Sequence, residues 1–275
     1  MTAPETPRTA TRGERWFTAL TGAAAPTTGS LLVADTTLAG RPARVLATRP
    51  DPRARRPRAR GGEIGLDEGW GLAAAVREAV TADAGSGTPR TLVAVVDAPS
   101  QAYGYQEELL GIHQALAAAV DAYSAARLAG HPVVALLVGK AISGAFLAHG
   151  LQAHRILALA DDAVQVQAMS KESAARVTQR TVAELEEAAR RVPATAYDGA
   201  TFATLGAVHE LLTVARPDTP APEDVARFTE ALARTVADIL TGPGDLSVRL
   251  ASEGARERRG PSLEVRRRLA AQWED

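Results

Sequence analysis

The chain has 275 residues, which is enough for one large domain with a substantial buried core. Its 31 basic and 32 acidic residues nearly cancel, and this balance argues against nucleic acid or an anionic membrane as the main partner. The sequence contains no cysteine, so disulfides, thiolate metal sites and a cysteine nucleophile are excluded, and a reducing compartment is favoured.

The N-terminal segment predicts a tail rather than a targeting signal. Residues 1–15 are rich in Pro, Thr and Arg and lack the apolar stretch of a signal peptide, so we expect them to be disordered. No segment offers the roughly 20 consecutive apolar residues of a membrane span. We therefore expect a cytoplasmic protein with a single domain over residues 16–275, of which residues 223–275 form a helical extension.

The first elements predict a hairpin followed by an irregular loop. Apolar runs at 31–34 and 43–48 flank a Gly-Arg-Pro turn, as two antiparallel strands would. Residues 50–60 contain three prolines and five arginines, which favours a solvated, mobile surface loop. The alternative is a basic lip beside a phosphate-bearing substrate.

The remaining elements alternate between helix and strand. Helical spacing at 66–82 leads to a β-branched strand at 91–96, a long helix at 106–129 and a buried strand at 132–138. A helix then runs to Gly150, two strands follow at 155–160 and 164–168, and helices are expected at 170–190, 223–240 and 263–273. This order predicts an α/β fold with crossover connections.

Two strand ends carry small-residue turns from which chemistry could arise. Asp97-Ala-Pro-Ser-Gln-Ala-Tyr-Gly104 follows one strand, and Gly139-Lys-Ala-Ile-Ser-Gly-Ala145 follows the next. Glycine allows close backbone approaches, and a helix N-terminus supplies unpaired N–H groups. Two such turns can aim backbone amides at one oxygen and so stabilise a thioester enolate or oxyanion. A pure packing role remains the alternative, and neither turn matches a phosphate-binding pattern.

Titratable and nucleophilic side chains give little support to other chemistry. Ser100 and Ser143 lack the Gly-x-Ser-x-Gly context of a hydrolase nucleophile, and Lys140 either binds an anion or is a solvated turn residue. Histidines at positions 113, 131, 149 and 154 have no acidic residue at an orienting spacing, so we interpret them as structural. No spacing of histidines and carboxylates predicts a metal site.

Several segments together resemble the gamma subunit of biotin-independent malonate decarboxylase. They are V-V-D-A-P-S-Q-A-Y-G, E-E-L-L-G-I-H-Q-A-L-A, A-G-H-P-V-V-A-L-L-V-G-K-A-I-S-G-A-F-L-A-H-G-L-Q-A and V-Q-A-M-S-K-E-S-A-A-R-V-T. Residues 90–185 carry the likeness most strongly. The chain also resembles, more distantly, the carboxyltransferase half that works with carboxybiotin in acetyl-CoA carboxylases.

The resemblance implies a crotonase-like (ClpP/crotonase) fold of repeated β-β-α units that packs against a homologous beta subunit. It implies that a transferase subunit loads malonate onto an acyl carrier subunit with a CoA-like prosthetic arm, and that the malonyl thioester is decarboxylated at the beta/gamma interface. Catalytic amides are then expected around Tyr103 and Gly104 and at Gly144 and Ala145, with Ser143 shaping its turn. Ser100 and Lys140 are candidates for substrate binding, and no cofactor is expected to be covalently attached to this chain.

Three alternatives remain open. A carboxyltransferase subunit of a biotin-dependent acyl-CoA carboxylase is disfavoured because Lys140-Ala141 stands where such relatives tend toward Glu-Gly. A non-catalytic scaffold would stabilise the true catalytic subunit. A stand-alone hydratase would need an acid/base pair such as Glu107 and Glu108, but these residues open a helix, where acidic side chains are favourable anyway.

Overall fold

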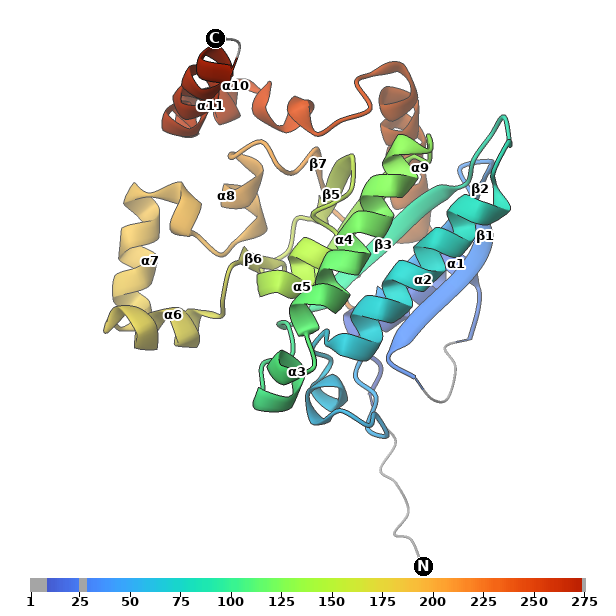
Figure 1. The fold of residues 1–275 in the computed structure, drawn as a ribbon, viewed down its shortest axis with the longest axis horizontal. Coiled ribbons are helices and arrows are strands. Elements are labelled where there is room, and N and C mark those ends of the chain that lie inside the picture. The colour runs from blue at the N-terminus through green and yellow to red at the C-terminus, as the bar shows by residue number, and fades with distance from the viewer. Residues whose placement is uncertain (1–8, 25–28, 274–275) are drawn as a thin grey trace, which may run out of the picture.

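A mixed seven-stranded sheet organises the protein in the computed structural model, which describes residues 9–24 and 29–273 (Figure 1). The strand order is β1-β2-β3-β4-β5-β7, and β6 pairs with the end of β4. Only β1 and β2 are antiparallel; the other pairs are parallel. The strands are β1 (Leu31–Leu38), β2 (Arg41–Thr48), β3 (Thr91–Ala98), β4 (Val133–Ile142), β5 (Arg155–Leu159), β6 (Gln165–Gln167) and β7 (Glu210–Leu212). The predicted N-terminal hairpin and the α/β class are confirmed.

Helices cover the sheet from both sides. Helices α2 (Leu66–Ala82) and α4 (Ile112–Leu128) pack against each other in front of the sheet in Figure 1, and α9 (Pro222–Thr241) lies behind it and contacts α1 (Arg12–Thr21). Strands β3 and β4 are consequently buried along almost their whole length, as their continuous apolar runs require.

The N-terminal segment is more ordered than its composition predicts. Helix α1 begins at Arg12, where Thr11 and Glu14 form a capping box, so the expected disordered tail over residues 1–15 was wrong for its last part. Trp16 is fully buried and its Nε1–H donates to the Pro217 carbonyl at 2.8 Å. Packing against distant segments therefore fixes this helix. Residues 1–8 of the expected tail lie outside the described residues.

Two helices predicted as continuous are each divided. The one expected over 106–129 consists of α3 (Tyr105–Leu109) and α4, and the break falls at Gly111, whose φ of 84° is left-handed. The one expected over 170–190 consists of α6 (Lys171–Thr178) and α7 (Val182–Arg191), separated at Gln179 with φ of 54°. Helices α6 and α7 lie away from the sheet (Figure 1).

The arginine-rich segment 50–60 is not simply solvated. The segment ends in a 3-10 helix, η1 (Pro57–Gly61). Two of its residues are buried: Asp51, which precedes this helix, and Ala59, which belongs to it. Arg56 Nε lies 3.6 Å from an Asp67 carboxylate oxygen, and the Arg58 guanidinium lies 3.2 Å from Glu63. These arginines neutralise carboxylates beside the start of α2.

The C-terminal residues form the expected helices together with shorter elements. After α9 come η3 (Ser247–Leu250), α10 (Glu253–Arg258) and α11 (Gly260–Trp273); the earlier short elements are α5 (Ser143–Ala148), η2 (Pro193–Thr195) and α8 (Gly199–Ala203). Within the described ranges, no helix has the length and apolar character to cross a membrane. Among the same residues, no cluster of three or more His, Asp or Glu side chains is arranged to hold a metal ion.

Candidate active site

The two predicted turns meet at one edge of the sheet. Strands β3 and β4 are parallel neighbours, and Ala98 pairs with Ala141 near their carboxyl ends. The segment after β3 is held in place by Ile64, whose N–H donates to the Ser100 carbonyl at 3.0 Å and whose carbonyl accepts from the Ala102 N–H at 2.8 Å. The backbone on which Gln101 sits is thus fixed on both sides.

The second turn is tighter than its sequence predicts. Strand β4 continues through Ile142, and α5 begins directly at Ser143, so Gly139 to Ile142 are strand residues rather than turn residues. Ser143 makes the change of direction with φ of 58°, an uncommon conformation for a residue with a side chain. Its Oγ accepts a hydrogen bond from the Gln101 N–H at 2.8 Å and lies 3.4 Å from Ser100 Oγ. The Ser143 hydroxyl therefore joins the two turns.

The lack of a side chain at Gly144 leaves room for an oxygen beside its backbone N–H. Its N–H donates to Gln101 Oε1 at 3.0 Å, and a Cβ added to Gly144 would lie 2.0 Å from that oxygen. Gly104 is different, because its φ of 165° is extended and a Cβ there would meet nothing within 4 Å. Of these two glycines, only Gly144 has an oxygen so close to its backbone that a side chain would collide with it.

Asp97 does more than cap its own strand. Its carboxylate accepts from the Gly13 N–H at 3.1 Å and from the Lys140 N–H at 3.2 Å, which ties α1 and β4 to the end of β3. A Cβ added to Gly139 would lie 2.2 Å from Asp97 Oδ1, so glycine at 139 makes room for this carboxylate. The Lys140 side chain is exposed, and its predicted contact with substrate stays a prediction.

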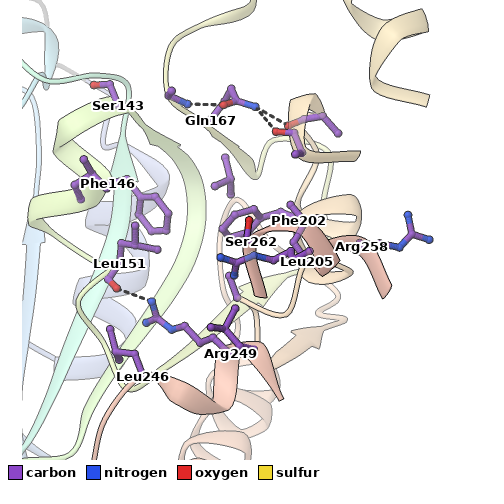
Figure 2. Close-up of a pocket in the computed structure, with 18 of the residues that line it drawn as sticks. Ser143, Phe146, Leu151, Gln167, Phe202, Leu205, Leu246, Arg249, Arg258 and Ser262 are labelled. Carbon is purple, nitrogen blue, oxygen red and sulfur yellow. Dashed lines mark hydrogen bonds between the residues drawn. The ribbon is translucent and has the colours of Figure 1, made fainter. Parts of the chain in front are cut away.

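A pocket of about 960 Å³ opens beside the two turns. Figure 2 shows Phe146 and Leu151 on one side of it and Phe202 and Leu205 on the other. The ring centroids of Phe146 and Phe202 are 6.3 Å apart in an edge-to-face arrangement. The walls near the turns are therefore apolar and come from segments far apart in the sequence.

The far end of the pocket is cationic. Arg249 donates to the Leu151 carbonyl at 2.8 Å and also to the Ala153 carbonyl (Figure 2). Burial lowers the pKa of Arg249 to about 10, which leaves it protonated at neutral pH. Arg258 of α10, Arg259 directly after it and Arg266 of α11 also line the pocket, together with Asp245. The pocket thus combines an apolar channel with a rim that can bind an anion.

The predicted site residues are divided between the pocket and its edge. Tyr103, Ser143 and Gly144 line the pocket, whereas Ser100, Gly104, Lys140 and Ala145 lie beside it in the same two chain segments. Sequence reasoning did not single out Gln101, which lines the pocket and accepts from the Gly144 N–H, although it stands inside the first quoted turn. It also missed the aromatic and arginine lining, for which the sequence offers no local signal.

Glu107 is a structural acid rather than a candidate general acid. It is buried, and its Oε2 accepts from the Leu66 N–H at 3.2 Å at the start of α2. Burial raises the pKa of Glu107. Because this carboxylate faces the first turn of α2, its position gives no support to the hydratase alternative.

His149 belongs to the core behind the site. Its Nε2–H donates to the Val95 carbonyl and its Nδ1 accepts from the Tyr123 hydroxyl, both at 3.0 Å, which defines the neutral tautomer. Burial lowers the pKa of His149 to about 4. The expectation that this histidine is structural is confirmed.

Acidification should therefore destabilise the fold through His149. The unfolded chain takes up a proton near the ordinary pKa of 6.5, whereas the folded chain takes it up only near 4, so stability is lost as pH falls between these values. Between pH 7.5 and pH 5 the contribution is about 2 kcal/mol. The free energy of unfolding in urea should fall by this additional amount between pH 7.5 and pH 5 in the native chain but not in His149→Gln. The glutamine amide keeps a donor and an acceptor but does not titrate. Equal pH slopes for the two proteins would contradict it.

The fold and the site first define a class. The mainly parallel sheet with helices on both faces has the fold of crotonase-like carboxyltransferases. A solved structure of transcarboxylase 12S with hydrolysed methylmalonyl-coenzyme A superposes with a TM-score of 0.57 at 20% identity, covering 78% of this chain and 36% of that one. At this identity the likeness concerns the fold.

Closer relatives narrow the class to one family. The sequence profile described as malonate decarboxylase gamma subunit matches residues 59–273, and the chain belongs to this family. The structure of a Pseudomonas malonate decarboxylase hetero-tetramer in complex with coenzyme A contains a chain that is 55% identical, with a TM-score of 0.90 and coverage of 96% of this chain and 100% of that one. A Pseudomonas MdcD-MdcE hetero-dimer gives 54% identity, a TM-score of 0.87 and the same coverage.

A curated relative carries a different activity in its name. The malonyl-S-ACP:biotin-protein carboxyltransferase MADD of Malonomonas rubra is 41% identical over 154 residues, which is 55% of this chain. The match spans about half of that relative, 53% of its length.

Proposed function

We propose that this chain and a homologous beta subunit together decarboxylate malonyl-S-acyl carrier protein to acetyl-S-acyl carrier protein and CO₂. The observation that carries the proposal is the position of the Gly144 amide in the wall of a pocket that is lined by apolar side chains and arginines. Membership in the malonate decarboxylase gamma subunit family supports the same reaction.

The reaction needs a place for a developing negative charge. When the bond between the carboxylate carbon and the α-carbon breaks, CO₂ leaves and the electron pair is delocalised onto the thioester oxygen as an enolate. Backbone amides at Gly144 and Ala145 would donate to this oxygen, and amides around Tyr103 and Gly104 would contribute from the other turn. Protonation of the α-carbon by solvent then gives the acetyl thioester.

The pocket suits the prosthetic arm that an acyl carrier subunit would deliver. Such an arm is a chain of methylene and amide groups that ends in a phosphate. Its thioester end would lie at Ser143 and Gly144, its middle between Phe146 and Phe202, and its phosphate toward the arginines of α10 and α11. No covalent cofactor on this chain is needed for this arrangement.

An exposed apolar surface beside the site suits a partner subunit. Tyr105 and Leu109 on α3, Leu110 directly after it and Leu147 on α5 are all at least half exposed. The Pseudomonas relative forms a hetero-dimer and a hetero-tetramer. We infer that the homologous beta subunit covers this surface, and that the acyl carrier and malonate transferase subunits complete the cycle.

Carbon dioxide release should require both subunits. The assay uses malonyl-carrier with this chain alone, with its co-expressed beta partner alone, and with the two together, in the absence of biotin. We expect turnover only with both. Turnover that does not depend on this chain would favour the scaffold alternative.

The second candidate function is carboxyl transfer to a biotin-bearing protein. It is favoured by the name of the Malonomonas rubra relative. Retention of the carboxyl group until a biotinylated carrier is added would support it, because the decarboxylase releases CO₂ without biotin.

A further inference from the structure

The Gly144 amide already has an oxygen ligand from within the chain. Gln101 Oε1 lies 3.0 Å from the Gly144 nitrogen, and the Gln101 side chain lines the pocket. This oxygen is an sp² amide oxygen, the same kind of acceptor as a thioester carbonyl. It occupies the position at which the proposed function requires the oxygen of the substrate.

Two other segments fix the backbone of Gln101, whereas its side chain faces the pocket and bonds to the Gly144 N–H. The Gln101 N–H donates to Ser143 Oγ at 2.8 Å, and residues on either side of it are bonded to Ile64. Rotation about the side-chain bonds therefore suffices to move Oε1 away from Gly144 without moving either turn. The glycine at 144 leaves room for one oxygen at this position, whether it comes from Gln101 or from a substrate.

We propose that Gln101 is an internal competitor that occupies the Gly144 amide until the thioester oxygen displaces it. A single N–H makes one good hydrogen bond, so binding of the thioester oxygen requires release of Gln101. The inference rests on the proposed function, since it assumes that the substrate uses this amide. It assigns Gln101 as a positioning residue that weakens ground-state binding.

Substitutions that weaken or strengthen the competitor should have opposite effects. In the assembled complex, Gln101→Ala should lower the KM for malonyl-carrier about two- to tenfold, the value of one neutral hydrogen bond, with kcat unchanged. Gln101→Met keeps the length of the side chain without the amide oxygen and should act in the same direction. Gln101→Glu should raise KM at least roughly tenfold, because a charged acceptor holds the amide more strongly.

The measurement is steady-state CO₂ release, with thermal unfolding of each complex as a check on folding. Gln114→Ala, an exposed glutamine on α4, is the matched control and should leave KM unchanged. A purely structural role predicts that all Gln101 variants change KM in one direction. That result, or an unchanged KM in all three, would overturn the proposal while leaving the decarboxylase function intact. Wild-type turnover that is independent of this chain would overturn both.

Discussion

Replacing Gly144 with valine should reduce the kcat for CO₂ release by the assembled complex at least roughly a hundredfold, the cost of losing one donor from an oxyanion-binding site. The new Cβ would lie 2.0 Å from the present position of Gln101 Oε1, too close for any oxygen to be bound there by the Gly144 amide. It would also lie 3.3 Å from Leu116 Cδ1, a contact that a shift of a few tenths of an ångström relieves. Association with the beta subunit should therefore survive.

Two further variants separate the causes of that loss. Gly87→Val introduces the same side chain at a glycine with open space around it and should leave activity unchanged. Gly144→Val combined with Gln101→Ala removes the clash with the glutamine but leaves the oxygen position filled. Recovery of activity in the double variant would contradict a role for this amide in binding the substrate oxygen, as would full activity of Gly144→Val alone.

Filling the pocket should impair binding of the carrier-borne substrate rather than the chemistry. Ala207 lines the pocket and belongs to neither turn, so Ala207→Trp places an indole in the channel. We expect at least a roughly tenfold rise in KM, which corresponds to about 1.4 kcal/mol of binding free energy, with a smaller change in kcat. Steady-state kinetics with malonyl-carrier measures both constants.

The matched control for this variant is Ala84→Trp, at an exposed alanine in the turn after α2. It adds the same side chain outside the pocket and should leave both constants unchanged. If Ala207→Trp changes neither constant while the complex stays folded, the prosthetic arm does not pass through this pocket.

The Gly144→Val and Ala207→Trp predictions concern two parts of the molecule, the Gly144 turn and the pocket walls. Only the first can be recognised in the sequence. The Gly144 turn can be recognised from its small residues after a buried strand, because such a cluster marks the end of a strand locally. The pocket walls cannot be recognised in this way. Phe146, Phe202 and Arg249 come from α5, α8 and η3, and only the packing of these elements brings them together.

Helix boundaries show the same division. The break at Gly111 carries a local signal, a glycine with positive φ, that the apolar periodicity of residues 106–129 conceals. The order of α1 has a weaker signal in the sequence. The capping box at its start is local, but the position of the helix depends on hydrogen bonds from Trp16 to Pro217 and from Gly13 to Asp97. Composition alone therefore predicted disorder where tertiary contacts impose a helix.

The sequence by itself determined the α/β class, the N-terminal hairpin, the buried parallel strands and the two glycine-bearing turns, because hydrophobic period and turn residues act over a few neighbouring positions. Only the tertiary structure decided that Gln101 reaches across 43 positions to the Gly144 amide and that arginines near the C-terminus close one end of the pocket. Such contacts depend on how the elements pack and on which rotamer each side chain adopts, and neither is encoded in the local pattern.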